Sequence, residues 1–176
     1  MSLTANAPKQ DNVGNARVTF ARETWADLWR DGQEIFKVHY DELALHKDAM
    51  PMGLDNALYL DLERRGFLLV VAARKSGALV GYYLAIILQH HPHNQGGGKV
   101  ATTDMFYLLK EHRKGGAGAR LLMAAERELR EQGVVKASIS TKTKFSSREL
   151  LEALGWEQTD LVFQKVLGAE LVNTGK

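Results

Sequence analysis

The sequence contains no cysteine. This absence excludes disulfide scaffolds, thiol nucleophiles and thiolate metal sites. Long apolar runs are lacking as well: the longest, residues 80–88, contains one glycine and two tyrosines and is far too short to cross a bilayer. The first 16 residues are polar and have no apolar core of a signal peptide. We therefore expect a cytoplasmic protein with no membrane partner.

An excess of charge of one sign is also lacking. The chain carries 23 basic and 21 acidic residues, a net charge of +2, which gives no reason to expect a nucleic-acid partner. What it does have is an ordinary globular composition, with 45% hydrophobic and 25% charged residues among 176. Such a chain can bury one sizeable core. We expect a flexible tail over residues 1–16 and a single domain over residues 17–176.

Hydrophobic periodicity predicts an alternation of strands and helices. Strands are expected at residues 17–20, 67–73, 79–88, 99–109, 134–141 and 156–167. Helices are expected to begin at Trp25, at Asp55, after the glycines near residue 116, and at the capping-box pattern 146–149. Gly32 either kinks or divides the first helix. The order indicates an α/β fold, with helices on both faces of a mixed, mostly antiparallel central sheet.

The most informative segment joins the strand 99–109 to the following helix. It contains Gly115, Gly116 and Gly118, directly after Arg113 and Lys114. The first turn of a helix has backbone N–H groups without internal partners and a positive dipole end, and glycines let an anion approach the backbone closely. The two cations add positive charge. This combination predicts a cradle for a phosphate or pyrophosphate.

Two common cradles do not match the segment. A P-loop requires Gly-x-x-x-x-Gly-Lys-Ser/Thr, which the chain does not contain. A dinucleotide fingerprint requires glycine or alanine three residues after Gly118, where Leu121 stands, and belongs in a first βαβ unit. A plain connecting turn is the remaining alternative, but three glycines within four residues exceed what a turn needs.

The pattern Arg113-x-x-Gly116-x-Gly118 resembles the acetyl-CoA loop of the GNAT superfamily of N-acetyltransferases. The closing segment, residues 151–156, is similar to the family's Tyr-Glu-Lys-Leu-Gly-Phe element, and the resemblance extends from residue 17 to 167. The blocks 66–81 and 104–118 look like acetyltransferases of phage and bacterial genomes. The resemblance implies acetyl-CoA as cofactor and direct acetyl transfer to a primary amine, on a small molecule or a protein.

Carried over position by position, the resemblance implies where the cofactor binds. The pyrophosphate would accept the backbone N–H groups of residues 114–119, with Arg113 beside it. The pantetheine arm would pair with the strand at residues 106–109, and the Leu108 N–H would polarise the thioester carbonyl. The implied cofactor residues are Phe106, Tyr107, Leu108, Arg113, Lys114, Gly115, Gly116, Ala117, Gly118 and Ala119.

The implied proton-transfer groups are less complete. Asp104 stands close to the family's carboxylate base, although it could equally be a surface residue in line with Thr102 and Thr103. The family's tyrosine acid corresponds to Leu151, which leaves Ser146 or water to protonate the thiolate. This departure supports an alternative function, a catalytically weak acyl-CoA-binding module that acts through a protein partner.

Two further expectations concern metal and assembly. The loop histidines His91 and His93 could ligate a metal, but without cysteine or a helical histidine pair we expect no metal site. Folds of this kind often pair through strands or helices, so a homodimer is compatible with the sequence. The His90–His93 loop remains an alternative source of a catalytic base.

Overall fold

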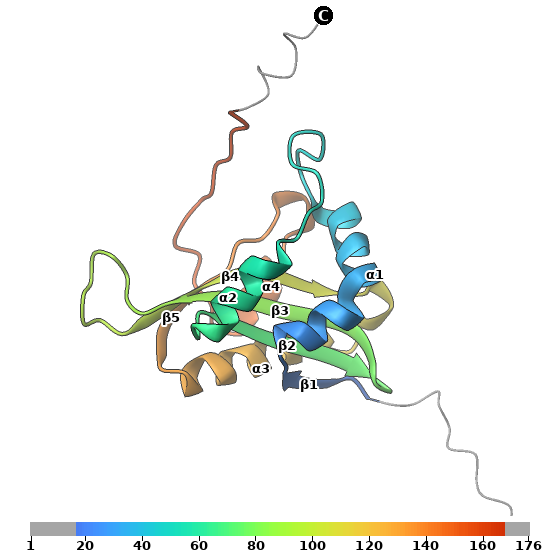
Figure 1. Ribbon diagram of the computed structural model, residues 1–176, viewed down its shortest axis with the longest axis horizontal. Coiled ribbons are helices and arrows are strands. Elements are labelled where there is room, and N and C mark those ends of the chain that lie inside the picture. Colours follow the sequence, from blue (N-terminus) through green and yellow to red (C-terminus); the bar gives the residue numbers. More distant parts are fainter. Residues whose placement is uncertain (1–16, 168–176) are drawn as a thin grey trace, which may run out of the picture.

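A five-stranded sheet runs through the computed structural model, which describes residues 17–167 (Figure 1). The tail expected at residues 1–16 lies outside the described residues. The strand order is β1-β2-β3-β4-β5. Neighbours pair antiparallel from β1 to β4, whereas β4 and β5 are parallel, which confirms a mixed and mostly antiparallel sheet. The strands are β1 Thr19–Arg22, β2 Leu68–Lys75, β3 Ala78–Leu88, β4 Lys99–Leu108 and β5 Val134–Ser138.

Helices cover both faces of this sheet, as expected (Figure 1). They are α1 Trp25–Leu43, α2 Asn56–Arg64, α3 Ala117–Glu131 and α4 Arg148–Ala153, with short 3₁₀ turns at Lys110–His112 and Thr143–Phe145. Side chains alternate between the faces along each strand. Leu68 and Val70 therefore pack with α1 and α2, whereas Leu69 and Val71 pack with α3 and α4. No helix among residues 17–167 is long and apolar enough to span a membrane.

Gly32 does not divide the first helix, because α1 is continuous over 19 residues. The glycine provides space: a Cβ atom at Gly32 would lie 2.6 Å from the ring of Phe36. Phe36 is 3% exposed and stacks on Trp25, so its ring has little room to move. The close packing of Phe36, and not a break in the helix, therefore explains the glycine at position 32.

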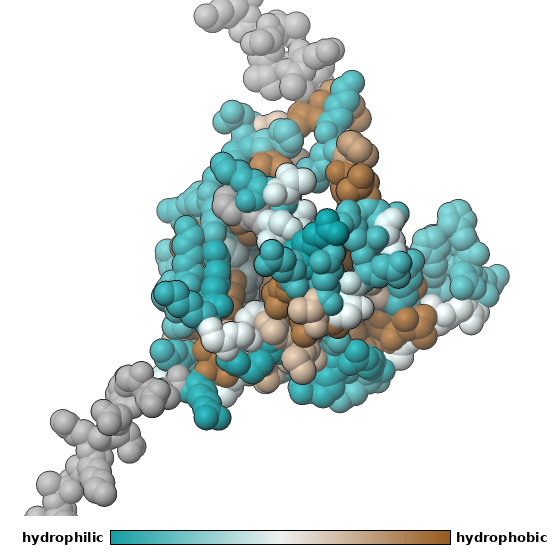
Figure 2. Space-filling model, turned by 180° about the vertical axis from the view of Figure 1, so that it is seen from behind, coloured by the Kyte–Doolittle hydropathy of each residue, from teal (hydrophilic) through white to brown (hydrophobic). Residues whose placement is uncertain are grey.

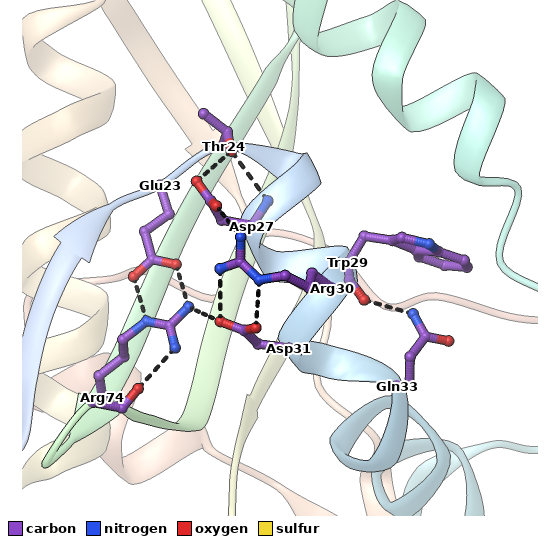
Figure 3. Close-up of polar contacts among 9 residues, drawn as sticks. Glu23, Thr24, Asp27, Trp29, Arg30, Asp31, Gln33 and Arg74 are labelled. Carbon is purple, nitrogen blue, oxygen red and sulfur yellow. Dashed lines mark hydrogen bonds and ion pairs between the residues drawn. The ribbon is translucent and has the colours of Figure 1, made fainter.

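An ion-pair network ties the start of α1 to β2 (Figure 3). Arg74 donates to both carboxylate oxygens of Glu23, at 2.6 and 2.7 Å, and to Asp31 at 2.8 Å. Arg30 in turn binds Asp27 and Asp31. Because Arg74 forms a fork–fork contact from a side chain that is 20% exposed, it orients α1 over the sheet more firmly than a typical surface pair would.

Local residues explain several helix ends. The Asp55 side chain accepts the N–H of Leu58 and begins α2, and Gly66 follows that helix with φ of 71°. At the end of α4, Trp156 donates to the Leu151 carbonyl and Gly155 to Glu152, as in a Schellman motif. The start of α4 differs from a capping box. Ser146 accepts the N–H of Arg148, while Ser147, the N-cap, makes no side-chain capping bond among the described residues.

The predicted final strand at residues 156–167 is wrong. Trp156 belongs to the end of α4, and residues 157–167 form no strand. Leu161, Val162 and Phe163 are instead 73%, 68% and 89% exposed. Figure 1 shows the segment leaving the body of the molecule, and Figure 2 shows hydrophobic side chains along it. A strand gains its hydrogen bonds only from a neighbour, so local β propensity could not decide whether one was within reach.

Candidate cofactor and acceptor site

One edge of β4 is partly open. β4 pairs with β3 along residues 100–108, but with β5 only over Lys99–Thr102. The Leu109 N–H donates to the Val80 carbonyl, and alternate residues of an antiparallel strand face opposite edges. Phe106 and Leu108 therefore present their backbone groups to the edge away from β3. Within the described chain, no strand occupies this edge beyond Thr102, so an extended ligand could pair with it.

The glycine loop lies between this edge and α3. Gly115 and Gly116 have φ of 70° and 75°, a left-handed conformation that favours glycine. A Cβ atom at Gly115 would meet no protein atom within 4 Å, so its backbone conformation, not crowding, explains the residue. The first intrahelical bond of α3 runs from the Arg120 N–H to the Gly116 carbonyl. The preceding N–H groups, at residues 117–119, are thus without helical partners, as an anion site requires.

The end of β4, the loop and α4 meet in one apolar cluster. A Cβ atom at Gly118 would lie 3.6 Å from Leu150 and 4.0 Å from the ring of Phe106, ordinary contact distances. Ala117 and Leu108 are buried in the same cluster, and so is Leu151, which is 9% exposed. Leu151, which the resemblance matches with the family's tyrosine acid, is therefore a core residue. Ser146 is exposed and accepts the Arg148 N–H, and its role in proton transfer stays a prediction.

The Arg113 side chain contacts α1 and the end of β4. Its two terminal nitrogens donate to the Glu42 carboxylate at 2.8 and 2.9 Å, and its Nε donates to the Leu108 carbonyl at 2.7 Å. The Arg113 hydrogen bonds hold the pKa of Glu42 at about 2, against the opposing effect of burial. The sequence gives no signal that Glu42 meets Arg113, 71 residues away.

Asp104 is aimed by a β-bulge. On β3, Leu84 pairs with Met105 and Ala85 with Thr103, so Asp104 has no partner there. Strict alternation would place Asp104 on the face opposite Met105, which packs with α1 and α2. The Asp104 carboxylate nevertheless accepts a hydrogen bond of 2.6 Å from the Tyr59 hydroxyl of α2. The bulge thus brings an exposed carboxylate to the α2 face of the sheet.

Tyr59 is well placed to hold that carboxylate. Its ring stacks on Trp25, with centroids 4.2 Å apart, and Trp25 is completely buried. Burial, followed by the hydrogen bond to Asp104, raises the pKa of Tyr59. The hydroxyl therefore stays protonated and donates at any ordinary pH. The sequence gives no signal that connects Tyr59 with Asp104, which is 45 residues away.

A polar and aromatic cluster extends from the same face toward Arg113. His39 forms a 2.6 Å hydrogen bond with the Tyr82 hydroxyl and stacks on Tyr107, with ring centroids 4.5 Å apart. Tyr107 donates to Glu42 at 2.6 Å. Burial lowers the pKa of His39 to about 4, so the ring is neutral near pH 7. The histidines of the 89–98 loop lie elsewhere, and residues 17–167 contain no group of three or more side chains suited to hold a metal.

Comparison with known proteins identifies the family of the chain. Residues 22–156 match the model of the acetyltransferase (GNAT) family. The chain belongs to the GNAT family. It is therefore an N-acetyltransferase, and acetyl-CoA is its co-substrate. No curated protein matches the chain.

Three solved structures illustrate the shared GNAT fold. An acetyltransferase from Trypanosoma brucei has a TM-score of 0.64 at 20% identity, over 86% of this chain and 100% of that one. AAC(6')-Iy, in complex with the bisubstrate analogue CoA-S-monomethyl-acetylneamine, has a TM-score of 0.60 at 19% identity, over 86% and 98%. A predicted acetyltransferase from Clostridium acetobutylicum, solved with acetyl-CoA, has a TM-score of 0.62 at 13% identity, over 86% and 97%.

Proposed function

We propose that this GNAT protein transfers the acetyl group of acetyl-CoA directly to a primary amine, carried by a small molecule or by a protein. The observation that carries the proposal is the continuity of two features: the open edge of β4 ends at the glycine loop, which begins α3. The edge can pair with an extended pantetheine arm, and the helix start can accept a pyrophosphate. These features fit acetyl-CoA, which supplies an activated thioester.

The cofactor residues are proposed from this geometry. Backbone N–H groups of residues 114–119 bind the pyrophosphate, with Lys114 adding charge. Phe106 and Leu108 pair with the pantetheine arm, while the side chain of Tyr107, between them, points to the α1 face. The Leu108 N–H donates to the thioester oxygen as negative charge develops there.

We propose that the acid–base steps take place on the α2 face of the sheet, where Asp104 lies. Asp104 accepts a proton from the attacking amine through a water molecule, and Tyr59 holds its carboxylate. The amine nitrogen bonds to the acetyl carbon while the carbon–sulfur bond breaks. The departing thiolate takes a proton from water or from Ser146, because Leu151 has no proton to give. The bisubstrate analogue bound to AAC(6')-Iy supports an amine as the acceptor.

The test measures CoA release from acetyl-CoA against a panel of primary amines and lysine peptides. We expect release above hydrolysis with at least one amine, and a rise in melting temperature with acetyl-CoA alone. Binding without release for every amine would refute the transfer and favour the binding module that the buried Leu151 suggests. Absence of both effects would refute the cofactor site as well.

We further propose that two copies of the chain form a homodimer. Each copy carries the exposed apolar side chains of residues 161–163 and Leu167, and β5, which pairs with β4 alone among the described strands. Val135 of β5 is 67% exposed. Segment and edge are complementary and present on the same chain, so two copies can exchange them reciprocally. Light scattering should give a molar mass twice that of the chain for the wild type, and the mass of a single chain for Phe163→Asp. A wild-type protein that is monomeric at micromolar concentration would refute the dimer.

A further inference from the structure

Arg113, the first residue of the cofactor loop, makes three hydrogen bonds to other parts of the chain. Arg113 donates to both oxygens of Glu42 and to the Leu108 carbonyl, and its guanidinium lies 5.2 Å from the centre of the Tyr107 ring. The Arg113 side chain is 40% exposed, whereas that of Glu42 is 9% exposed. The bidentate contact with Glu42 and the contact with Leu108 together join the last turn of α1 to the end of β4.

The environment of Glu42 makes this contact demanding to replace. Its carboxylate also accepts the Tyr107 hydroxyl, and Lys110 is its other nearby cation, with Nζ at 3.9 Å. His39, which lies on α1 as Glu42 does, stacks its ring on Tyr107. Removing Arg113 would leave a nearly buried carboxylate with one neutral donor and one distant cation. Such a loss is costly, because the remaining charge stays desolvated.

The third contact bears on the proposed chemistry. Leu108 presents both its N–H and its carbonyl to the open edge of β4. The Arg113 Nε occupies the carbonyl, which leaves the N–H as the group that this residue offers to a ligand. Anchoring residue 108 through its carbonyl also fixes the position of that N–H, and a donor to a developing negative charge must be held in place to be effective.

We propose that Arg113 and Glu42 are positioning residues for the Leu108 N–H, and that Arg113 acts as a strut between α1 and β4 rather than as a pyrophosphate ligand. The inference rests on the proposed role of Leu108. It also gives Glu42 a part in the reaction without contact to either substrate.

A truncated donor separates the two roles of Arg113. Acetyl-pantetheine carries the thioester but no pyrophosphate, so a phosphate ligand cannot affect it. For Arg113→Gln and Glu42→Gln we expect kcat/KM to fall by about tenfold or more with acetyl-CoA and by the same factor with acetyl-pantetheine. The double variant should be little worse than either single one, because both remove the same strut. Lys114→Gln is the matched control, expected to weaken acetyl-CoA only.

A second measurement does not depend on turnover. Hydrogen exchange of the neighbouring Leu109 amide, which donates to the Val80 carbonyl in the free protein, should accelerate in both variants but not in Arg130→Gln, which removes an exposed helix pair with Glu126. A loss confined to acetyl-CoA, or Leu109 exchange unchanged in both variants, would overturn the strut. A wild-type protein that transfers to no amine would instead refute the proposed function, and the exchange data would still decide on the strut.

Discussion

His39 should make the stability of the protein depend strongly on pH. Desolvation lowers the pKa of His39 to about 4, from 6.5 for a free side chain, and the charges of Lys142 and Arg113 act in the same direction while Glu42 opposes them. Between these two pH values the unfolded chain binds a proton at this position and the folded chain does not. The free energy of unfolding therefore falls as the pH falls from 6.5 to 4.

The magnitude follows from the shift. One pKa unit corresponds to about 1.4 kcal/mol, so His39 alone should lower the free energy of unfolding by about 2 kcal/mol at pH 5 and about 3 kcal/mol near pH 4. Well above pH 6.5, His39 is neutral in both the folded and the unfolded chain, and this loss of stability is absent. Such a loss is a large part of the 5–15 kcal/mol that stabilises a typical domain.

Urea denaturation at half-unit intervals from pH 4 to 7.5 tests the reasoning. His39→Gln removes the titration and retains an amide that can bond to the Tyr82 hydroxyl, so its curve should be flatter than that of the wild type by the amounts given. Subtracting the curve of His39→Gln from that of the wild type removes the contributions of the carboxylates and of the other histidines. Parallel curves would show that His39 is solvated in the folded protein, which would contradict its packing between Tyr82 and Tyr107.

Four further predictions concern the site and the fold. Asp104→Asn should lower kcat by about two orders of magnitude with acetyl-CoA binding retained, and Tyr59→Phe should lower it less, by about tenfold, in steady-state assays. Gly116→Val should abolish the rise in melting temperature on adding acetyl-CoA, because valine does not favour φ of 75°, while circular dichroism stays unchanged. Leu151→Tyr should change the rate by less than about tenfold, since that side chain lies in the core. Gly32→Ala should destabilise by about 1–3 kcal/mol in urea, despite the better helix propensity of alanine, because Phe36 has no space to move.

The order of elements could be predicted because each has a local cause. The runs at β2 and β3 are apolar on both faces, and the Asp55 cap and the glycines after α2, α3 and α4 act within a few residues. The glycine loop could be predicted for the same reason, because its glycines and cations are neighbours in the sequence. The course of residues 157–167 was not, because a strand depends on a neighbouring edge that the segment itself does not encode.

The contacts that build the site are long-range, and no periodicity reports them. Tyr59 and Asp104 are 45 residues apart, and Arg113 and Glu42 are 71 apart. The first pair also requires a bulge, which depends on the register of β4 against β3. Alternation alone assigns Asp104 to the wrong face. The sequence could therefore suggest which residues take part, but not that α2 contacts β4 at Asp104 and that α1 contacts the end of β4 at Tyr107.

Spacing along β4 determines how Asp104 would act. Asp104 and Leu108 are four residues apart, which corresponds to about 13 Å of extended strand. A base must come within hydrogen-bond distance of the proton it accepts, directly or through a water molecule. An amine that attacks a thioester bound at Leu108 is therefore too far from Asp104 for direct transfer, whereas one at Phe106, which faces the same edge, is closer. If Leu108 binds the carbonyl, as we propose, water must carry the proton, and the exposed Asp104 carboxylate is open to it.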